Sequence, residues 1–134
     1  MSEQDYAEQL KGKRGFRRIV NAAGYSRDGL TAAYRYESAF RQLVWLNGIL
    51  IILAFILDFG PASRMILVGA SFLSLIVELL NTAIEAAVDH TSTAKNELAK
   101  RAKDAGSAAQ MLSMTLMAIL WLMALWREYG FNIF

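Results

Sequence analysis

The sequence contains no cysteine and only one proline. Without thiols, a disulfide scaffold, a cysteine-ligated metal site and a thiol nucleophile are excluded. Charged residues make up only 19% of the 134 residues and the net charge is +2, so we expect no nucleic-acid partner. The length fits a single domain. Hydrophobic residues make up 55% of it, which is high for a soluble domain of this size.

Three long stretches carry most of the apolar residues. Residues 43–57 and 108–126 have no charge, and residues 65–77 are uncharged before a helical pattern continues to about residue 88. A helix needs about 20 residues to cross a bilayer. We therefore predict an all-α membrane protein with spans at about 39–57, 65–88 and 106–126. The alternative is a soluble bundle with an unusually apolar core, for which little polar surface would remain.

Positive charges are distributed unevenly around these spans. Eight of the 14 Lys and Arg residues precede residue 43, four lie in 95–103, and the loop after the first span has only Arg64. Because cytoplasmic loops carry the positive excess, we expect a cytoplasmic N-terminus and second loop, and an outer C-terminus. No secretory apolar region precedes the first span, which is expected to act as its own signal.

The segment before the first span also has a helical pattern. Apolar residues recur at Phe16, Ile19, Val20 and Ala23, which is typical of an amphipathic helix. We expect surface helices over 15–38, with a break at 24–26 where Ser26 caps the second one. Residues 1–14 are expected to be a flexible extension and 128–134 a tail, on either side of one domain over 15–127. The alternative for the arginines is a basic lipid anchor without a chemical role.

The second span carries polar side chains along one face. In ELLNTAIEAAVDH, residues Glu78, Asn81, Glu85 and Asp89 fall within about 100° of one another at helical periodicity. Ionisable groups in a membrane are costly and mark functional sites. Burial disfavours the charged form of Glu78, which makes it a candidate proton acceptor. The alternatives are hydrogen bonding between helices and a proton relay in a carrier.

The segment that leads into the third span, ELAKRAKDAGSAA (97–109), adds a second polar group. Lys103 supplies a mobile positive charge suited to phosphate, and Asp104 can accept hydrogen bonds from hydroxyls or amines. With Glu37 and Glu85 as oxygen ligands, this set suits a magnesium nucleotide. The sequence has no P-loop and no protein-kinase glycine loop, so a nucleotide site would be of another kind.

Four segments together resemble a known family. GFRRIVNAAGYSRDGL (15–30), ESAFRQ (37–42), VELLNTAIEAAVD (77–89) and AKDAGSAA (102–109) are similar to the bacterial integral-membrane diacylglycerol kinases, in the same order along the chain. The resemblance implies a homotrimer in the bacterial inner membrane with active sites shared between subunits. It also implies transfer of the γ-phosphoryl group of MgATP to diacylglycerol, with Mg²⁺ as the metal.

The resemblance further implies roles for individual residues. Glu78 would be the general base and Asn81 would support the reacting groups, while Glu37 and Glu85 would hold the metal with the phosphates. The nucleotide would be contacted by these two carboxylates and by Arg18, Tyr25, Lys95, Asn96, Lys103 and Asp104. The lipid head region would be contacted by Arg18, Ser26, Arg41, Gln42, Glu78 and Ser107.

Two other functions stay open at this point. An undecaprenol kinase of the same family would use the same residues, and the intact ESAFRQ segment favours diacylglycerol over the polyprenol. A small proton-coupled transporter would use Glu78 but would not need Lys103 and Asp104 or an arginine-rich surface helix.

Overall fold

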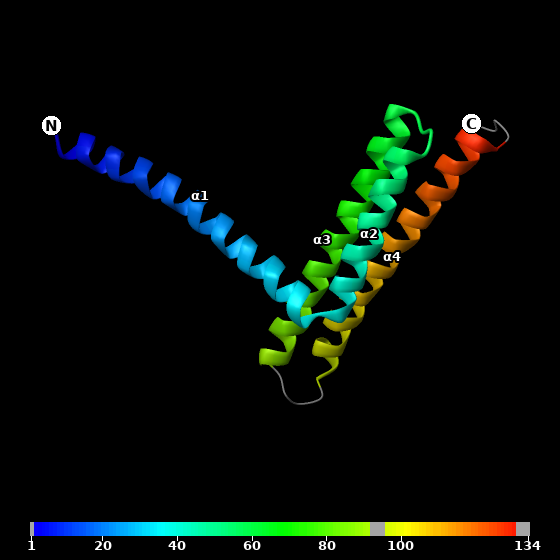
Figure 1. The fold of residues 1–134 in the computed structure, drawn as a ribbon. Helices are drawn as coiled ribbons and strands as arrows, with labels where there is room; N and C mark the ends of the chain where they lie inside the picture. Colours follow the sequence, from blue (N-terminus) through cyan, green and yellow to red (C-terminus); the bar gives the residue numbers. More distant parts are fainter. Residues whose placement is uncertain (1, 92–95, 131–134) are drawn as a thin grey trace. The chain divides into compact units, whose positions relative to one another are not determined.

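The computed structural model describes residues 2–91 and 96–130, with the backbone alone for 10–13. Four helices follow one another and no strand occurs within those residues: α1 (Glu3–Tyr36), α2 (Ser38–Ile56), α3 (Pro61–Thr91) and α4 (Glu97–Tyr129) (Figure 1). The chain divides into two compact units, Met1–Glu37 and Ser38–Phe134. The all-α prediction is therefore confirmed, and each unit is described by itself.

Helix α1 makes up most of the first unit and begins with a capping box. The Ser2 hydroxyl accepts a hydrogen bond from the backbone N–H of Asp5, and the Asp5 carboxylate accepts one from the backbone N–H of Ser2. Hydrogen bonds from Ser2 hold the pKa of Asp5 below its ordinary value. The helix ends at Tyr36, and Glu37 follows it with an extended backbone before α2 begins at Ser38.

The expected break at 24–26 is wrong, because α1 continues through it and Ser26 caps no helix. Gly24 costs only about 1 kcal/mol relative to alanine inside a helix, and the two residues before it, Ala22 and Ala23, have the highest helix propensity. No described glycine has a positive φ, so Gly24 follows the ordinary helical backbone. Because α1 starts at Glu3, residues 3–14, which we expected to be an extension, belong to the same helix. One helix therefore replaces the extension and the two surface helices predicted from the sequence.

The second unit is a bundle in which α3 packs against both α2 and α4 (Figure 1). All three helices are long and apolar enough to cross a membrane, which agrees with the three predicted spans. Pro61 occupies the first turn of α3, where its missing N–H is not needed. With 31 residues, α3 is about 46 Å long and exceeds a bilayer core of about 30 Å. Polar turns of α3 therefore extend past the apolar stretch.

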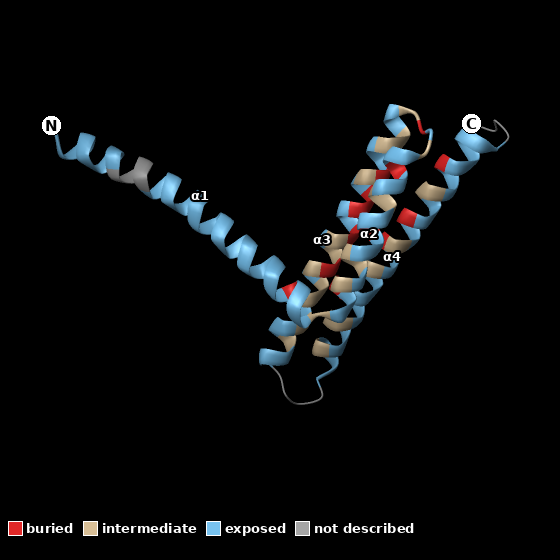
Figure 2. Ribbon diagram, in the orientation of Figure 1, coloured by how far each residue is buried: buried red, intermediate tan, exposed pale blue. Residues whose placement is uncertain are grey.

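Few residues of the bundle are buried, and most positions on its helices are exposed or intermediate (Figure 2). Many large apolar side chains, such as Trp45 and Phe55, are exposed. Small residues such as Ala54 and Ser74 share the interior with a few large ones, among them Leu67. Small residues at the helix contacts allow backbones to approach closely, as in membrane bundles. A soluble bundle would bury most of its large apolar residues instead. Together with the length and composition of the three helices, this exposure supports a multi-pass membrane protein.

One end of the bundle is closed by contacts between α4 and the α2–α3 connection. The Tyr129 hydroxyl accepts a hydrogen bond from the backbone N–H of Asp58 at 2.8 Å, and Glu128 accepts one from Gly60 at 3.0 Å. Phe59 is buried between the rings of Trp121 and Tyr129, in edge-to-face contacts. These contacts fix the short connection and leave the other end of the bundle for the polar residues of α3.

Candidate functional site

The candidate site lies on the polar face of α3 toward its C-terminal end. Glu78 is buried with 7% of its surface exposed, Asn81 and Glu85 are half-buried, and Asp89 is exposed in the last turns. Glu78 and Glu85 are about 10 Å apart along the helix axis. The predicted polar stripe therefore runs from the interior of the bundle to its water-facing end, with its acidic groups increasingly exposed along the way.

Asn81 packs against α4 at Gly106, which is buried. A Cβ atom at Gly106 would overlap the side-chain oxygen of Asn81, so glycine is required for the carboxamide to lie there. That oxygen is buried and has no hydrogen-bond partner among residues 2–91 and 96–130. A buried acceptor without a partner is costly and suits a group that meets a substrate.

Lys103 joins the two helices at the exposed end of the site. Its ammonium group forms an ion pair with the Asp89 carboxylate at 2.9 Å, and Glu85 is a second negative neighbour. The lysine side chain retains 41% of its exposure and the aspartate 64%. Exposed ion pairs contribute little and exchange readily with other partners. Lys103 is thus held beside Glu85 while remaining available to an anion.

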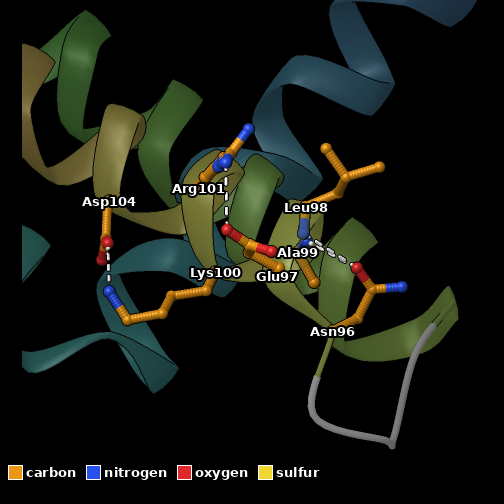
Figure 3. Close-up of polar contacts among 7 residues, drawn as sticks. All are labelled: Asn96, Glu97, Leu98, Ala99, Lys100, Arg101 and Asp104. Atoms are coloured by element: carbon orange, nitrogen blue, oxygen red, sulfur yellow. Dashed lines mark hydrogen bonds and ion pairs between the residues drawn. The ribbon is translucent and has the colours of Figure 1, made fainter.

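The neighbouring residues of α4 pair along their own helix (Figure 3). Asp104 forms an ion pair with Lys100 at 2.7 Å, and Arg101 forms one with Glu97 at 2.9 Å. Asn96, expected to contact a nucleotide, caps α4 by accepting hydrogen bonds from Leu98 and Ala99. Its oxygen therefore has a structural role, which orients the start of α4 and with it Lys103 and Asp104.

The remaining predicted residues are distributed over both units. Arg18, Tyr25 and Ser26 are exposed on α1, and Arg18 and Tyr25 line the same shallow depression on that helix. Glu37 is half-buried at the end of the first unit. In the second unit, Arg41 is half-buried and Gln42 is exposed near the start of α2. Ser107 is exposed on α4, and Lys95 lies outside the described residues.

The described part of the chain holds no cluster of three or more His, Asp or Glu side chains that could bind a metal by themselves. Magnesium in phosphoryl-transfer sites is commonly held by one or two carboxylates together with the phosphates of the substrate. Glu85, half-buried beside Lys103, fits a site of this kind. The structure therefore brings together Glu78, Asn81, Glu85 and Lys103, from α3 and α4.

Sequence reasoning missed a second polar group inside the bundle, formed by Asn47, Ser74, Gln110 and Ser113. Asn47 and Ser74 are almost fully buried and hydrogen-bond to each other across α2 and α3. The sequence feature that could have revealed this group is Asn47, a polar residue within the uncharged run 43–57. Such a residue is costly in a membrane unless it is paired. Hydrogen bonds between helices, the alternative role for the polar face of α3, are made by this group and by Asp89, which pairs with Lys103 of α4.

The chain is similar to known proteins over most of its length. Residues 24–125 match the family model described as prokaryotic diacylglycerol kinase. The diacylglycerol kinase of Pseudomonas aeruginosa is 51% identical over 84% of this chain and 91% of that protein. The diacylglycerol kinase of Escherichia coli is 43% identical over 87% of this chain and 95% of its own length. That of Helicobacter pylori is 44% identical over 81% of this chain and 84% of its own length.

Proposed function

The chain belongs to the prokaryotic diacylglycerol kinase family, and on that premise we propose that it transfers the γ-phosphoryl group of MgATP to the hydroxyl of diacylglycerol. The lipid oxygen forms a bond to the γ-phosphorus while the bond from that phosphorus to the β–γ bridging oxygen breaks. The products are phosphatidic acid and ADP. The observation that supports this most is the buried Glu78, about one turn from Asn81 on the polar face that continues to Glu85, where Lys103 of α4 lies.

Glu78 is the general base in this proposal. Its carboxylate accepts the proton of the lipid hydroxyl as the oxygen attacks phosphorus. Phosphoryl transfer depends mainly on positioning and on neutralising charge, so the base has only to be held in place while other groups neutralise the phosphates. The unpaired oxygen of Asn81 lies against α4 on the same face and orients the reacting hydroxyl.

Lys103 binds the phosphates and exchanges its ion pair with Asp89 for the triphosphate. Asp104 contacts the nucleotide. Glu85 and Glu37 would hold Mg²⁺ together with the phosphates, and the ion would supply positive charge to them. We assign Arg18, Tyr25 and Asn96 to the nucleotide as well. The lipid head region is assigned to Arg18, Ser26, Arg41, Gln42, Glu78 and Ser107.

The setting of the site follows from the same proposal. The exposed apolar residues of α1, among them Phe16, Ile19 and Val20, suit an amphipathic helix that lies on the membrane surface. The charge distribution favours the inner membrane with a cytoplasmic N-terminus and an outer C-terminus. We further propose a homotrimer with shared active sites, because one small chain cannot enclose both a lipid and a nucleotide.

The test is an assay of the purified protein in mixed micelles with labelled ATP. Diacylglycerol and undecaprenol are offered in separate reactions, and phosphate transferred to each lipid is measured. We expect transfer to diacylglycerol that requires Mg²⁺ and is lost in Glu78→Gln. Transfer to undecaprenol alone would assign the chain to polyprenol phosphorylation. Proton uptake into vesicles without transfer to either lipid would favour the transporter.

A further inference from the structure

Ser74 lies at the point where hydrogen bonds from all three bundle helices meet. Its hydroxyl accepts a hydrogen bond from the side-chain amide of Asn47 on α2 at 2.9 Å and donates one to the carbonyl of Ser71 at 2.8 Å. Its carbonyl accepts one from the side-chain amide of Gln110 on α4 at 3.4 Å. We call Asn47, Ser74 and Gln110 the Ser74 junction.

Each partner of Ser74 is itself held in place. Asn47 also donates to the carbonyl of Leu43 in its own helix at 2.9 Å, so both of its amide hydrogens are used. The oxygen of the Gln110 amide accepts a hydrogen bond from Ser113 at 2.7 Å, which points the nitrogen of that amide toward Ser74. The amides therefore reach α3 from two sides in defined orientations.

The junction lies one helical turn from Glu78. Four residues correspond to about 6 Å along the axis and to a rotation of about 40° from the same direction. In a regular helix, the Ser74 carbonyl that accepts from Gln110 also accepts from the backbone N–H of Glu78. Contacts that fix the rotation of α3 at Ser74, and its position along the helix axis, therefore also fix Glu78.

Directional contacts matter here, in addition to close packing, because the hydrophobic effect does little to fix the rotation of a helix in a membrane. Lipid tails are as apolar as leucine, so a helix can rotate with little loss of hydrophobic free energy. A hydrogen bond weakens steeply when its angle changes. From this geometry we propose that Asn47 and Gln110 are positioning residues that, through Ser74, hold α3 so that the Glu78 carboxylate stays inside the bundle. The proposal rests on the proposed role of Glu78 as the base.

The first test separates turnover from stability. Asn47→Leu replaces the amide by an apolar side chain of similar size and also removes an oxygen that has no partner among the described residues. We expect kcat to fall about tenfold because a small displacement of a catalytic group slows the reaction. KM for ATP is expected to stay within about twofold, and the midpoint of thermal unfolding to stay unchanged. Full kcat would overturn the proposal, as would a loss of kcat matched by loss of the folded protein.

The control is Thr115→Val in α4. The Thr115 hydroxyl is exposed and donates to the carbonyl of Met111 in its own helix. The variant therefore removes a hydroxyl without changing the Ser74 junction. The double variant Asn47→Leu/Ser74→Ala should be no slower than the worse single variant, because both remove the same hydrogen bond. Independent effects that multiply in the double variant would contradict the junction.

A last measurement does not depend on activity. Because the chain has no cysteine, Glu78→Cys places a single thiol at the site. Asn47→Leu in that background is expected to raise the rate of reaction with a small water-soluble thiol reagent about threefold, since reactivity follows exposure. Thr115→Val should leave the rate unchanged, and an equal rate in the Asn47 variant would overturn the proposal. Thiol reactivity can be measured even if the lipid assay finds no kinase activity. Failure of the positioning role can therefore be distinguished from failure of the proposed function.

Discussion

Lys103 and Asp89 form an ion pair at 2.9 Å that joins the C-terminal end of α3 to the start of α4. The same lysine lies near Glu85, so the candidate phosphate ligand is held among acidic groups. A triphosphate must compete with Asp89 for the ammonium group. The pair therefore keeps Lys103 in place and also opposes nucleotide binding.

This competition gives the first prediction. Lys103→Ala should raise KM for ATP and lower kcat/KM by about 10- to 100-fold, because a phosphate contact is lost. Asp89→Asn should lower KM for ATP about twofold, because the competing charge is removed. Steady-state kinetics with varied ATP measure both. Arg101→Ala, which breaks an ion pair within α4, is the control and should leave KM unchanged.

Glu78→Gln should lower kcat by a factor of about 100 to 10,000, since the amide cannot accept the hydroxyl proton. The amide has nearly the same size as the buried carboxylate, so the fold should be retained. Transfer of labelled phosphate reports the rate, and circular dichroism reports the helices. Turnover within a few fold of the unaltered protein would remove Glu78 from the role of base.

Glu85→Ala should increase the Mg²⁺ concentration needed for half-maximal activity by about tenfold, because one carboxylate ligand is lost. A magnesium titration at saturating ATP measures it. Glu97→Ala is the control, because Glu97 is a carboxylate of α4 that pairs with Arg101. An unchanged magnesium requirement in the Glu85 variant would contradict the metal assignment.

Gly106→Ala should displace the Asn81 carboxamide, since the added methyl group occupies the place of its oxygen. We expect kcat to fall at least about tenfold as the reacting hydroxyl loses its orienting group. Gly69→Ala is the matched control, because nothing lies within 4 Å of a Cβ atom there. That variant should keep its activity and gain slightly in stability. Equal activity in both glycine variants would exclude the Asn81 contact from the mechanism.

Tyr129→Phe removes the hydroxyl that accepts from Asp58 at the far end of the bundle. The midpoint of thermal unfolding in detergent should fall by about 2 to 5 °C, because the N–H of the connection loses its partner. Since this end is remote from Glu78, kcat at 25 °C should be unchanged. Tyr6→Phe, in α1, serves as the control for loss of a phenol elsewhere.

The sequence pattern predicted some segments of the structure well and others poorly. The three long apolar helices were predicted well because a helix that can cross a bilayer must be apolar along its length and satisfy its own backbone. The division of α1 at Gly24 was wrong, since one glycine lowers helix stability without ending a helix. The Ser74 junction was missed because Asn47, Ser74 and Gln110 are far apart in sequence and share no local pattern.

The sequence by itself determined that three helices can span a membrane and that Glu78, Asn81 and Glu85 share a face, because both properties depend on residues a few positions apart. Only the tertiary structure decided that Lys103 meets Asp89 and that Asn81 needs Gly106. Such contacts depend on how α3 and α4 are rotated and shifted against each other. Helical periodicity carries no information about that relation, because it describes each helix alone.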